Sequence, residues 1–95
     1  MIHMFSKSYC PYCKKAIALA RQYGIEPDVL QLDEIPDGQT IQNEIQRNTG
    51  QKTVPAIWIN DNFIGGYNKL LKLHQNGTLG GMLQTRESPL QKKNI

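Results

Sequence analysis

The two cysteines of this chain form the pattern Cys10-Pro11-Tyr12-Cys13, and they are the only cysteines among its 95 residues. Two thiols separated by two residues can form an intramolecular disulfide and exchange it with the disulfide of another molecule. The pattern therefore predicts thiol-disulfide exchange.

Cys10 is favoured as the attacking sulfur because it precedes a predicted helix. A thiol attacks a disulfide only as its thiolate, so it needs positive potential and access to solvent. Pro11 suits the first helical position, and the unpaired N–H groups and positive dipole end of the helix would then face the Cys10 sulfur. Further positive charge comes from Lys7, Lys14 and Lys15. We expect an exposed, ionised sulfur at Cys10.

Cys13 would lie one turn into the same helix, on its inner side. There we expect a shielded, protonated thiol, close enough to attack a mixed disulfide formed on Cys10. Two other interpretations are open. The pair could be two reduced core thiols, although a core cysteine rarely lies in so polar a turn. It could also ligate zinc, but structural zinc usually takes four ligands, and His3 and His74 lie far from the pair without finger spacing. We expect no metal.

The residues around the cysteines predict a strand, a helix and a second strand. The short apolar segment 2–5 is typical of a buried strand. Residues 11–23 have one apolar face at helical spacing, and Gly24 is suited to end that helix. Residues 28–33 predict a second strand, parallel to the first and reached by a right-handed connection.

The rest of the chain predicts one more helix, a hairpin and two short helices. The expected bounds are a helix capped by Asp37 and ending near Thr49, strands over 53–60 and 63–64 joined at 60–62, and helices over 68–75 and 79–83. Trp58, Phe63 and the leucines of the first of these short helices are expected in the core. The order of elements predicts a small α/β fold with one mixed sheet and helices on both faces.

Three motifs, in this order, resemble a dithiol glutaredoxin of the Cys-Pro-Tyr-Cys type: Cys10-Pro11-Tyr12-Cys13, Thr53-Val54-Pro55 and Gly65-Gly66-Tyr67. The resemblance covers about residues 1–84. It implies a thioredoxin-like fold with a four-stranded mixed sheet, and a glutaredoxin domain over residues 1–85. Residues 86–95 are polar and lack periodicity, so we expect them to form a flexible C-terminal tail.

The resemblance also implies that glutathione binds beside Cys10. In relatives the proline at position 55 is cis, so that the Val54 backbone pairs with the cysteinyl unit of glutathione. Lys7 resembles the lysine that holds the glycine carboxylate, with Gln42 as a helper. The glycine pair admits a close ligand at a helix N-terminus. The glutathione-binding residues implied in this way are Lys7, Tyr12, Gln42, Thr53, Val54, Pro55, Gly65, Gly66, Tyr67 and Asn68.

Lys69 departs from the family pattern. After Gly-Gly-Tyr, relatives usually place a small polar residue and then an Asp that receives the γ-glutamyl ammonium, whereas this chain has Asn68 and Lys69. Asn68 can still accept a hydrogen bond and cap the helix. Lys69 removes a charge partner of the ammonium and would repel it.

The function that the resemblance implies is glutathione-dependent reduction of glutathionylated substrates and protein disulfides. Cys10 would attack, and Cys13 or a second glutathione would resolve the mixed disulfide. One alternative is an iron-sulfur carrier, in which two chains hold a 2Fe-2S cluster through Cys10 and two glutathiones; Pro11 argues against it. Another is a thioredoxin-like or NrdH-type protein reduced by thioredoxin reductase, although the Trp-Cys-Gly-Pro-Cys signature is absent.

Composition narrows the range of partners and locations. The net charge is +3, but the lysines are scattered, which favours a small anion over nucleic acid. No apolar run approaches the roughly 20 residues of a membrane helix, and the first residues lack the zones of a signal peptide. We therefore expect a cytoplasmic, monomeric protein of one domain that binds neither nucleic acid nor membrane.

Overall fold

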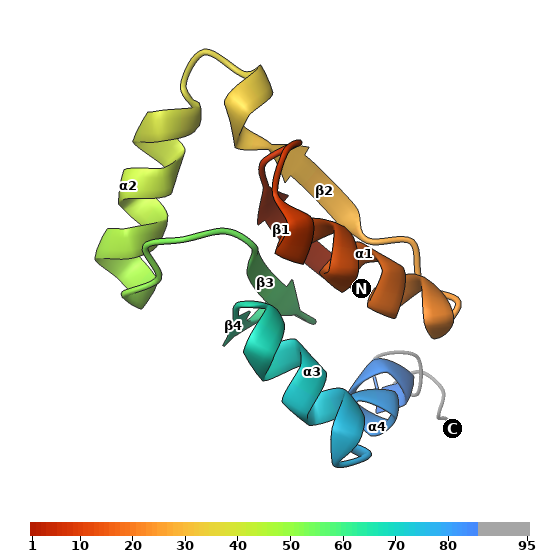
Figure 1. Cartoon of the computed structure of the whole chain (residues 1–95). Helices are drawn as coiled ribbons and strands as arrows, with labels where there is room; N and C mark the ends of the chain where they lie inside the picture. Colours follow the sequence, from red (N-terminus) through yellow and green to blue (C-terminus); the bar gives the residue numbers. More distant parts are fainter. Residues whose placement is uncertain (86–95) are drawn as a thin grey trace.

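The computed structural model describes residues 1–85, which form one four-stranded sheet flanked by helices (Figure 1). The elements are β1 (Ile2–Ser6), α1 (Pro11–Gln22), β2 (Asp28–Gln31), the 3-10 helix η1 (Leu32–Glu34), α2 (Gly38–Thr49), β3 (Ala56–Ile59), β4 (Asn62–Gly65), α3 (Tyr67–Gln75) and α4 (Thr78–Thr85). The strand order is β2-β1-β3-β4, with β2 parallel to β1 and the other pairs antiparallel. The mixed sheet is confirmed, whereas the tail predicted over 86–95 lies outside the described residues.

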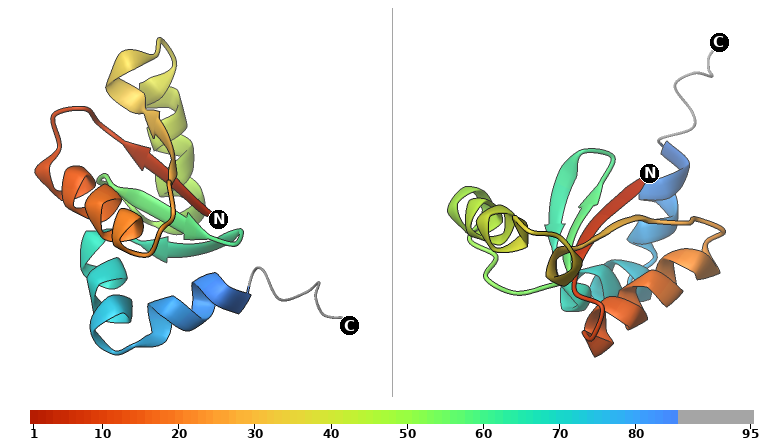
Figure 2. Two further views of the ribbon diagram at one scale, coloured as in Figure 1. Left: turned by 90° about the vertical axis from the view of Figure 1, so that its right-hand side faces the viewer. Right: turned by 90° about the horizontal axis from the view of Figure 1, so that it is seen from above.

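The main core lies on the sheet face that α1, α3 and α4 cover, while α2 lies on the other side (Figure 2). Burial alternates along β1, because successive side chains of a strand point to opposite faces. The buried members of this core are Ile2, Met4, Ala16, Leu19, Ala20, Ile57, Ile59, Leu70, Leu79 and Leu83. This core holds the β1-α1 connection, and with it the cysteines, against the sheet.

A row of aromatic rings occupies the opposite sheet face. Trp58 contacts Phe5 edge-on at 5.5 Å between ring centroids and Phe63 at 4.8 Å. All three side chains are only half-buried. The prediction that Trp58 and Phe63 belong to the core is therefore wrong in degree: they sit on the second face, outside the cluster of fully buried side chains.

Two strands are shorter than the sequence predicts. The segment predicted over 28–33 leaves the sheet after Gln31, where buried Leu32 begins η1. The segment predicted over 53–60 joins the sheet only at Ala56. The carbonyls of Thr53 and Pro55 instead accept hydrogen bonds from Gln51. Residues 53–55 therefore form a loop, although their residue types favour a strand.

Local capping and turn chemistry mostly follows the sequence, except that the N-cap of α3 is Gly66 and not Asn68, which lies one residue inside the helix. Asp37 does occupy the N-cap of α2, but its side chain makes no capping hydrogen bond there. Asn60 and Asp61 have positive φ values of 51° and 72°, which confirms the tight turn between β3 and β4. The last helix runs over Thr78–Thr85, longer than predicted despite its two glycines.

Gly38 allows α2 to begin directly against η1, and we expect Gly38→Ala to lower the free energy of unfolding by about 2 kcal/mol or more. A Cβ at this position would overlap the Leu32 carbonyl oxygen and lie 2.8 Å from its carbon. Chemical denaturation measures the effect.

Gly80→Ala is the matched control within another helix. Its Cβ would meet a Tyr23 ring carbon at 3.7 Å, an ordinary contact. Since alanine is the better helix former, this variant should gain about 0.5 to 1 kcal/mol. Equal effects of the two substitutions would contradict the close approach at Gly38.

Candidate active site

Cys10 is the N-cap residue of α1. Its backbone is extended, with φ −88° and ψ 115°, and its Sγ accepts a hydrogen bond from the Cys13 N–H at 3.2 Å. Pro11 takes the first helical position, and the first turn contains no acidic residue. The positive end of α1 is therefore directed at the Cys10 sulfur, as the sequence predicts.

The exposure of Cys10 is lower than predicted, because the residue is only 9% exposed. The Val54 carbonyl oxygen lies 3.8 Å from Sγ, close enough to accept a weak hydrogen bond from the thiol. Cys10 borders a hollow of about 310 Å³ lined by Lys7, Tyr9, Cys10, Pro11, Gln42, Lys52, Thr53 and Val54. A substrate must therefore enter this hollow to reach the sulfur.

Cys13 lies on the inner side of α1 and is 1% exposed. Burial, followed by the hydrogen-bonded contact with Cys10, raises the pKa of the Cys13 thiol to about 11. At neutral pH this thiol is almost entirely protonated. Cys13 is shielded as predicted, but Cys10 is also buried, and the two differ in that only Cys10 borders a hollow.

Alkylation of Cys13 in a Cys10→Ser variant should depend steeply on pH. Only the thiolate reacts, so the rate should rise about tenfold per pH unit well beyond the ordinary thiol value of about 8.5. The reaction with iodoacetamide, followed by mass spectrometry, measures this profile. The same variant in denaturant is the control, and superimposable profiles for folded and unfolded protein would show that burial does not suppress ionisation.

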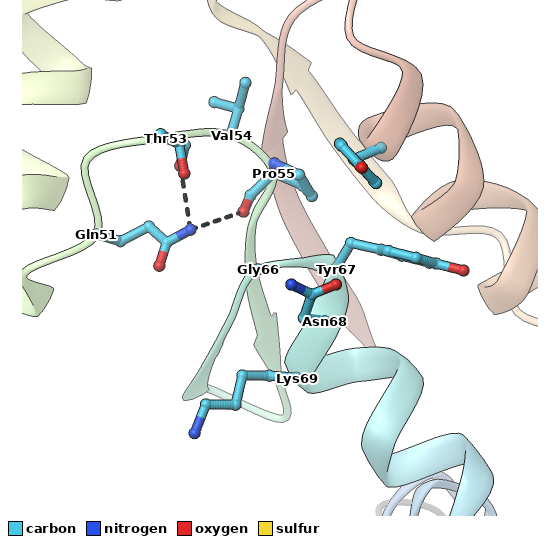
Figure 3. Close-up of a pocket in the computed structure, with 9 residues that line it drawn as sticks. Gln51, Thr53, Val54, Pro55, Gly66, Tyr67, Asn68 and Lys69 are labelled. Carbon is cyan, nitrogen blue, oxygen red and sulfur yellow. Dashed lines mark hydrogen bonds between the residues drawn. The ribbon is translucent and has the colours of Figure 1, made fainter.

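A second hollow of about 350 Å³ lies between the loop before β3 and the start of α3 (Figure 3). Its lining residues are Tyr12, Gln51, Thr53, Val54, Pro55, Gly66, Tyr67, Asn68 and Lys69. The Val54-Pro55 peptide bond is cis. A Cβ on Gly66 would lie 3.1 Å from Gln51 Nε2, so the absence of a side chain lets α3 approach the loop closely.

Tyr12 forms one wall of this second hollow. Its ring is 5.9 Å from that of Tyr67, and the Lys15 ammonium lies 5.4 Å from the Tyr12 ring centroid. The side chain remains 55% exposed. The role of Tyr12 in glutathione binding, which the family resemblance implies, stays a prediction.

The residues implied to bind glutathione divide between the two hollows, which share Thr53 and Val54. Lys7 and Gln42 line the Cys10 hollow, and the Gln42 amide also donates to the Lys52 carbonyl at 3.0 Å. Gly65 lines neither hollow. The second hollow holds the others: Tyr12, Pro55, Gly66, Tyr67 and Asn68.

Gln51, Tyr9 and Lys52 line the hollows but were not predicted as site residues. The Gln51 side-chain amide donates to the carbonyls of Thr53 and Pro55, each at 3.2 Å, and so shapes the loop that faces Cys10. The spacing of residues in the sequence does not predict these hydrogen bonds from Gln51. Lys52 was detectable, because it directly precedes the Thr-Val-Pro motif.

Two other features of residues 1–85 bear on the alternatives. No described helix is both long and apolar enough to cross a membrane. Over the same residues, no three His, Cys, Asp or Glu side chains are grouped to hold a metal ion. The absence of a metal in the working protein stays a prediction.

A cysteine that caps a helix, faces a cis-proline loop and has a buried partner one turn on places this chain among dithiol oxidoreductases of the thioredoxin-like fold. The Glutaredoxin family profile matches residues 2–64. The chain belongs to the glutaredoxin family, and its function is that of a glutathione-dependent thiol-disulfide oxidoreductase.

Individual glutaredoxins are similar to this chain in sequence and structure over most of its length. Glutaredoxin-1 of Rhizophagus irregularis is 44% identical over 82 residues, which are 86% of this chain and 81% of that protein. A buckwheat glutaredoxin-glutathione complex superposes with a TM-score of 0.86 at 37% identity, covering 88% of this chain and 76% of that one. A dithiolic glutaredoxin of Trypanosoma brucei brucei gives 0.82 at 38% identity, covering 86% and 84%.

Proposed function

We propose that Cys10 is the attacking sulfur of this oxidoreductase and Cys13 the resolving sulfur. The observation that carries the proposal is the contrast within one helical turn. Cys10 accepts the Cys13 N–H and borders a hollow, whereas Cys13 is buried with a pKa of about 11. Only the first can meet a large disulfide directly.

The reaction on a glutathionylated substrate proceeds by two exchanges. The Cys10 thiolate attacks the glutathione sulfur, a disulfide forms between Cys10 and glutathione, and the substrate leaves as a thiolate. A second glutathione thiolate then attacks the bound glutathione sulfur, which releases glutathione disulfide and restores Cys10. No oxidant or reductant other than glutathione is needed.

A protein disulfide takes the dithiol route. Cys10 attacks one substrate sulfur and frees the other, and Cys13 loses its proton and attacks the Cys10 sulfur. The products are a reduced substrate and a disulfide between Cys10 and Cys13, which two glutathiones reduce in turn. The 3.2 Å contact between the Cys13 N–H and Cys10 Sγ supports this route, since it joins the two residues before reaction.

Glutathione would lie across Val54 with its two ends in the two hollows. Lys7 is available to the glycine carboxylate, and Asn68 with the N-terminus of α3 is available to the opposite carboxylate. The buckwheat relative forms a complex with glutathione, which supports glutathione as the ligand of this site.

We propose glutathionylated or disulfide-containing proteins as physiological substrates, and a monomer in the cytoplasm as the working form. A reducing compartment suits a protein whose only cysteines cycle between dithiol and disulfide.

The function is tested by asking which reducing system regenerates the dithiol of the oxidised protein. The oxidised protein is offered either glutathione, NADPH and glutathione reductase, or NADPH and thioredoxin reductase, and NADPH consumption is followed. We expect regeneration by the glutathione system. Regeneration by thioredoxin reductase alone would contradict glutathione dependence.

A further inference from the structure

We propose that the two hollows beside Cys10 select disulfide substrates in which acidic side chains flank the reacting cysteine, with Lys69 as the specificity-determining residue. The inference rests on the proposed attack by Cys10. It adds the class of polypeptide that this site prefers.

Apart from the Cys10 sulfur, the charged side chains that line the hollows are all lysines. Lys7 and Lys52 line the Cys10 hollow, and Lys69 lines the second one. Among the described residues that border either hollow there is no Asp or Glu. Both sides of the loop that faces Cys10 therefore present positive charge to a bound chain.

The stem of Lys69 passes close to the backbone of Gly65. A Cβ on Gly65 would lie 3.0 Å from Lys69 Cγ, so the lysine stem lies across a residue that lacks a side chain. Lys69 also lies in the first turn of α3, where the helix dipole adds positive potential. In the close-up its side chain extends to the opposite side from the Tyr67 ring (Figure 3).

The carboxylate of Asp33 interacts electrostatically with Lys7 and so offsets part of the positive charge beside Cys10. Asp33 accepts hydrogen bonds from the Ser8 N–H, at 2.9 Å, and from the Ser8 hydroxyl. These bonds, together with the charge of Lys7, lower the pKa of the carboxyl and keep it negatively charged at neutral pH, but Asp33 lines neither hollow. At the rim, Lys15 over Tyr12 adds another cation.

The shape of the site suits a polypeptide that extends to both sides of its cysteine. The hollows measure about 310 and 350 Å³ and meet at Thr53 and Val54, beside the Cys10 sulfur. A substrate cysteine at that junction sends its preceding residue into one hollow and its following residue into the other. An acidic residue on either side would meet a lysine, and a basic residue would be repelled.

The test uses blocked pentapeptides with a central cysteine in disulfide linkage to neutral 2-thiopyridine. The residues on both sides of the cysteine are Glu, Gln or Lys. The Cys10 thiolate attacks the peptide sulfur and releases 2-thiopyridone, which is followed by absorbance. The rate for each peptide is divided by its rate with dithiothreitol, which corrects for the intrinsic reactivity of the disulfide.

We expect the Glu peptide to react faster than the Gln peptide by about threefold per acidic residue, and the Lys peptide to react more slowly than the Gln peptide. In Lys69→Asp the ratio of Glu to Gln rates should fall toward one, with Lys69→Gln intermediate. Lys72→Gln, on the same helix but outside the second hollow, should keep the native ratio.

Equal corrected rates for the three peptides would overturn the inference and leave the proposed function intact. A native ratio that survives in Lys69→Asp would overturn the role of Lys69. Release of 2-thiopyridone from none of the peptides, together with inactivity on a glutathionylated substrate, would instead count against Cys10 as the attacking sulfur.

Discussion

Cys10→Ser is expected to lower turnover of a glutathionylated substrate by about a thousandfold or more. A serine hydroxyl stays protonated at neutral pH and cannot exchange with a disulfide. Cys13 cannot replace it, because that thiol is 1% exposed and its pKa is about 11. The glutathione reductase-coupled assay measures the loss.

The fold of this variant should be preserved, which makes its activity interpretable. Cys10 is an N-cap residue whose side chain accepts the Cys13 N–H, and serine is among the best N-cap residues. Thermal unfolding is the control, and its midpoint should not fall. A folded Cys10→Ser variant that keeps a tenth of native activity would refute the role given to Cys10.

Cys13→Ser is expected to separate the two reactions. Deglutathionylation needs only Cys10 and glutathione, so its rate should stay within about threefold of the native rate. Reduction of a protein disulfide by the dithiol route should fall by about a hundredfold, because no neighbouring protein thiol can attack the Cys10 mixed disulfide and only glutathione from solution can resolve it. The same preparations are assayed on a glutathionylated peptide and on an oxidised protein substrate.

The mixed disulfide provides a second readout for this variant. Mass spectrometry should find the protein substrate covalently held on Cys10 of Cys13→Ser but not on the native chain. Equal loss of both reactions in the two cysteine variants would contradict the division of roles between them.

The features predicted correctly from the sequence are those that depend on residues close together in the chain. The order of helices and strands followed from hydrophobic spacing and glycine positions, and Pro11 correctly indicated that Cys10 caps α1. The inward position of Cys13 followed from helical geometry, since it lies three residues further along the helix.

Features that depend on contacts between distant segments were not predictable in this way. The reduced exposure of Cys10 depends on the Val54 carbonyl, 44 residues away in the sequence. Residue types at 53–55 favour a strand, but Gln51 binds the carbonyls on both sides of Val54 and keeps this segment a loop. Trp58 and Phe63 were assigned to the core because hydrophobicity alone does not show which sheet face is well covered.

Stoichiometric alkylation of the fully reduced native protein tests the central claim most directly. One equivalent of iodoacetamide is added at neutral pH, and the labelled peptide is mapped by mass spectrometry. The label should be found almost entirely on Cys10, since only the thiolate reacts and Cys13 has a pKa of about 11. Label divided evenly between the two cysteines, or found mainly on Cys13, would contradict the assignment of Cys10 as the attacking sulfur.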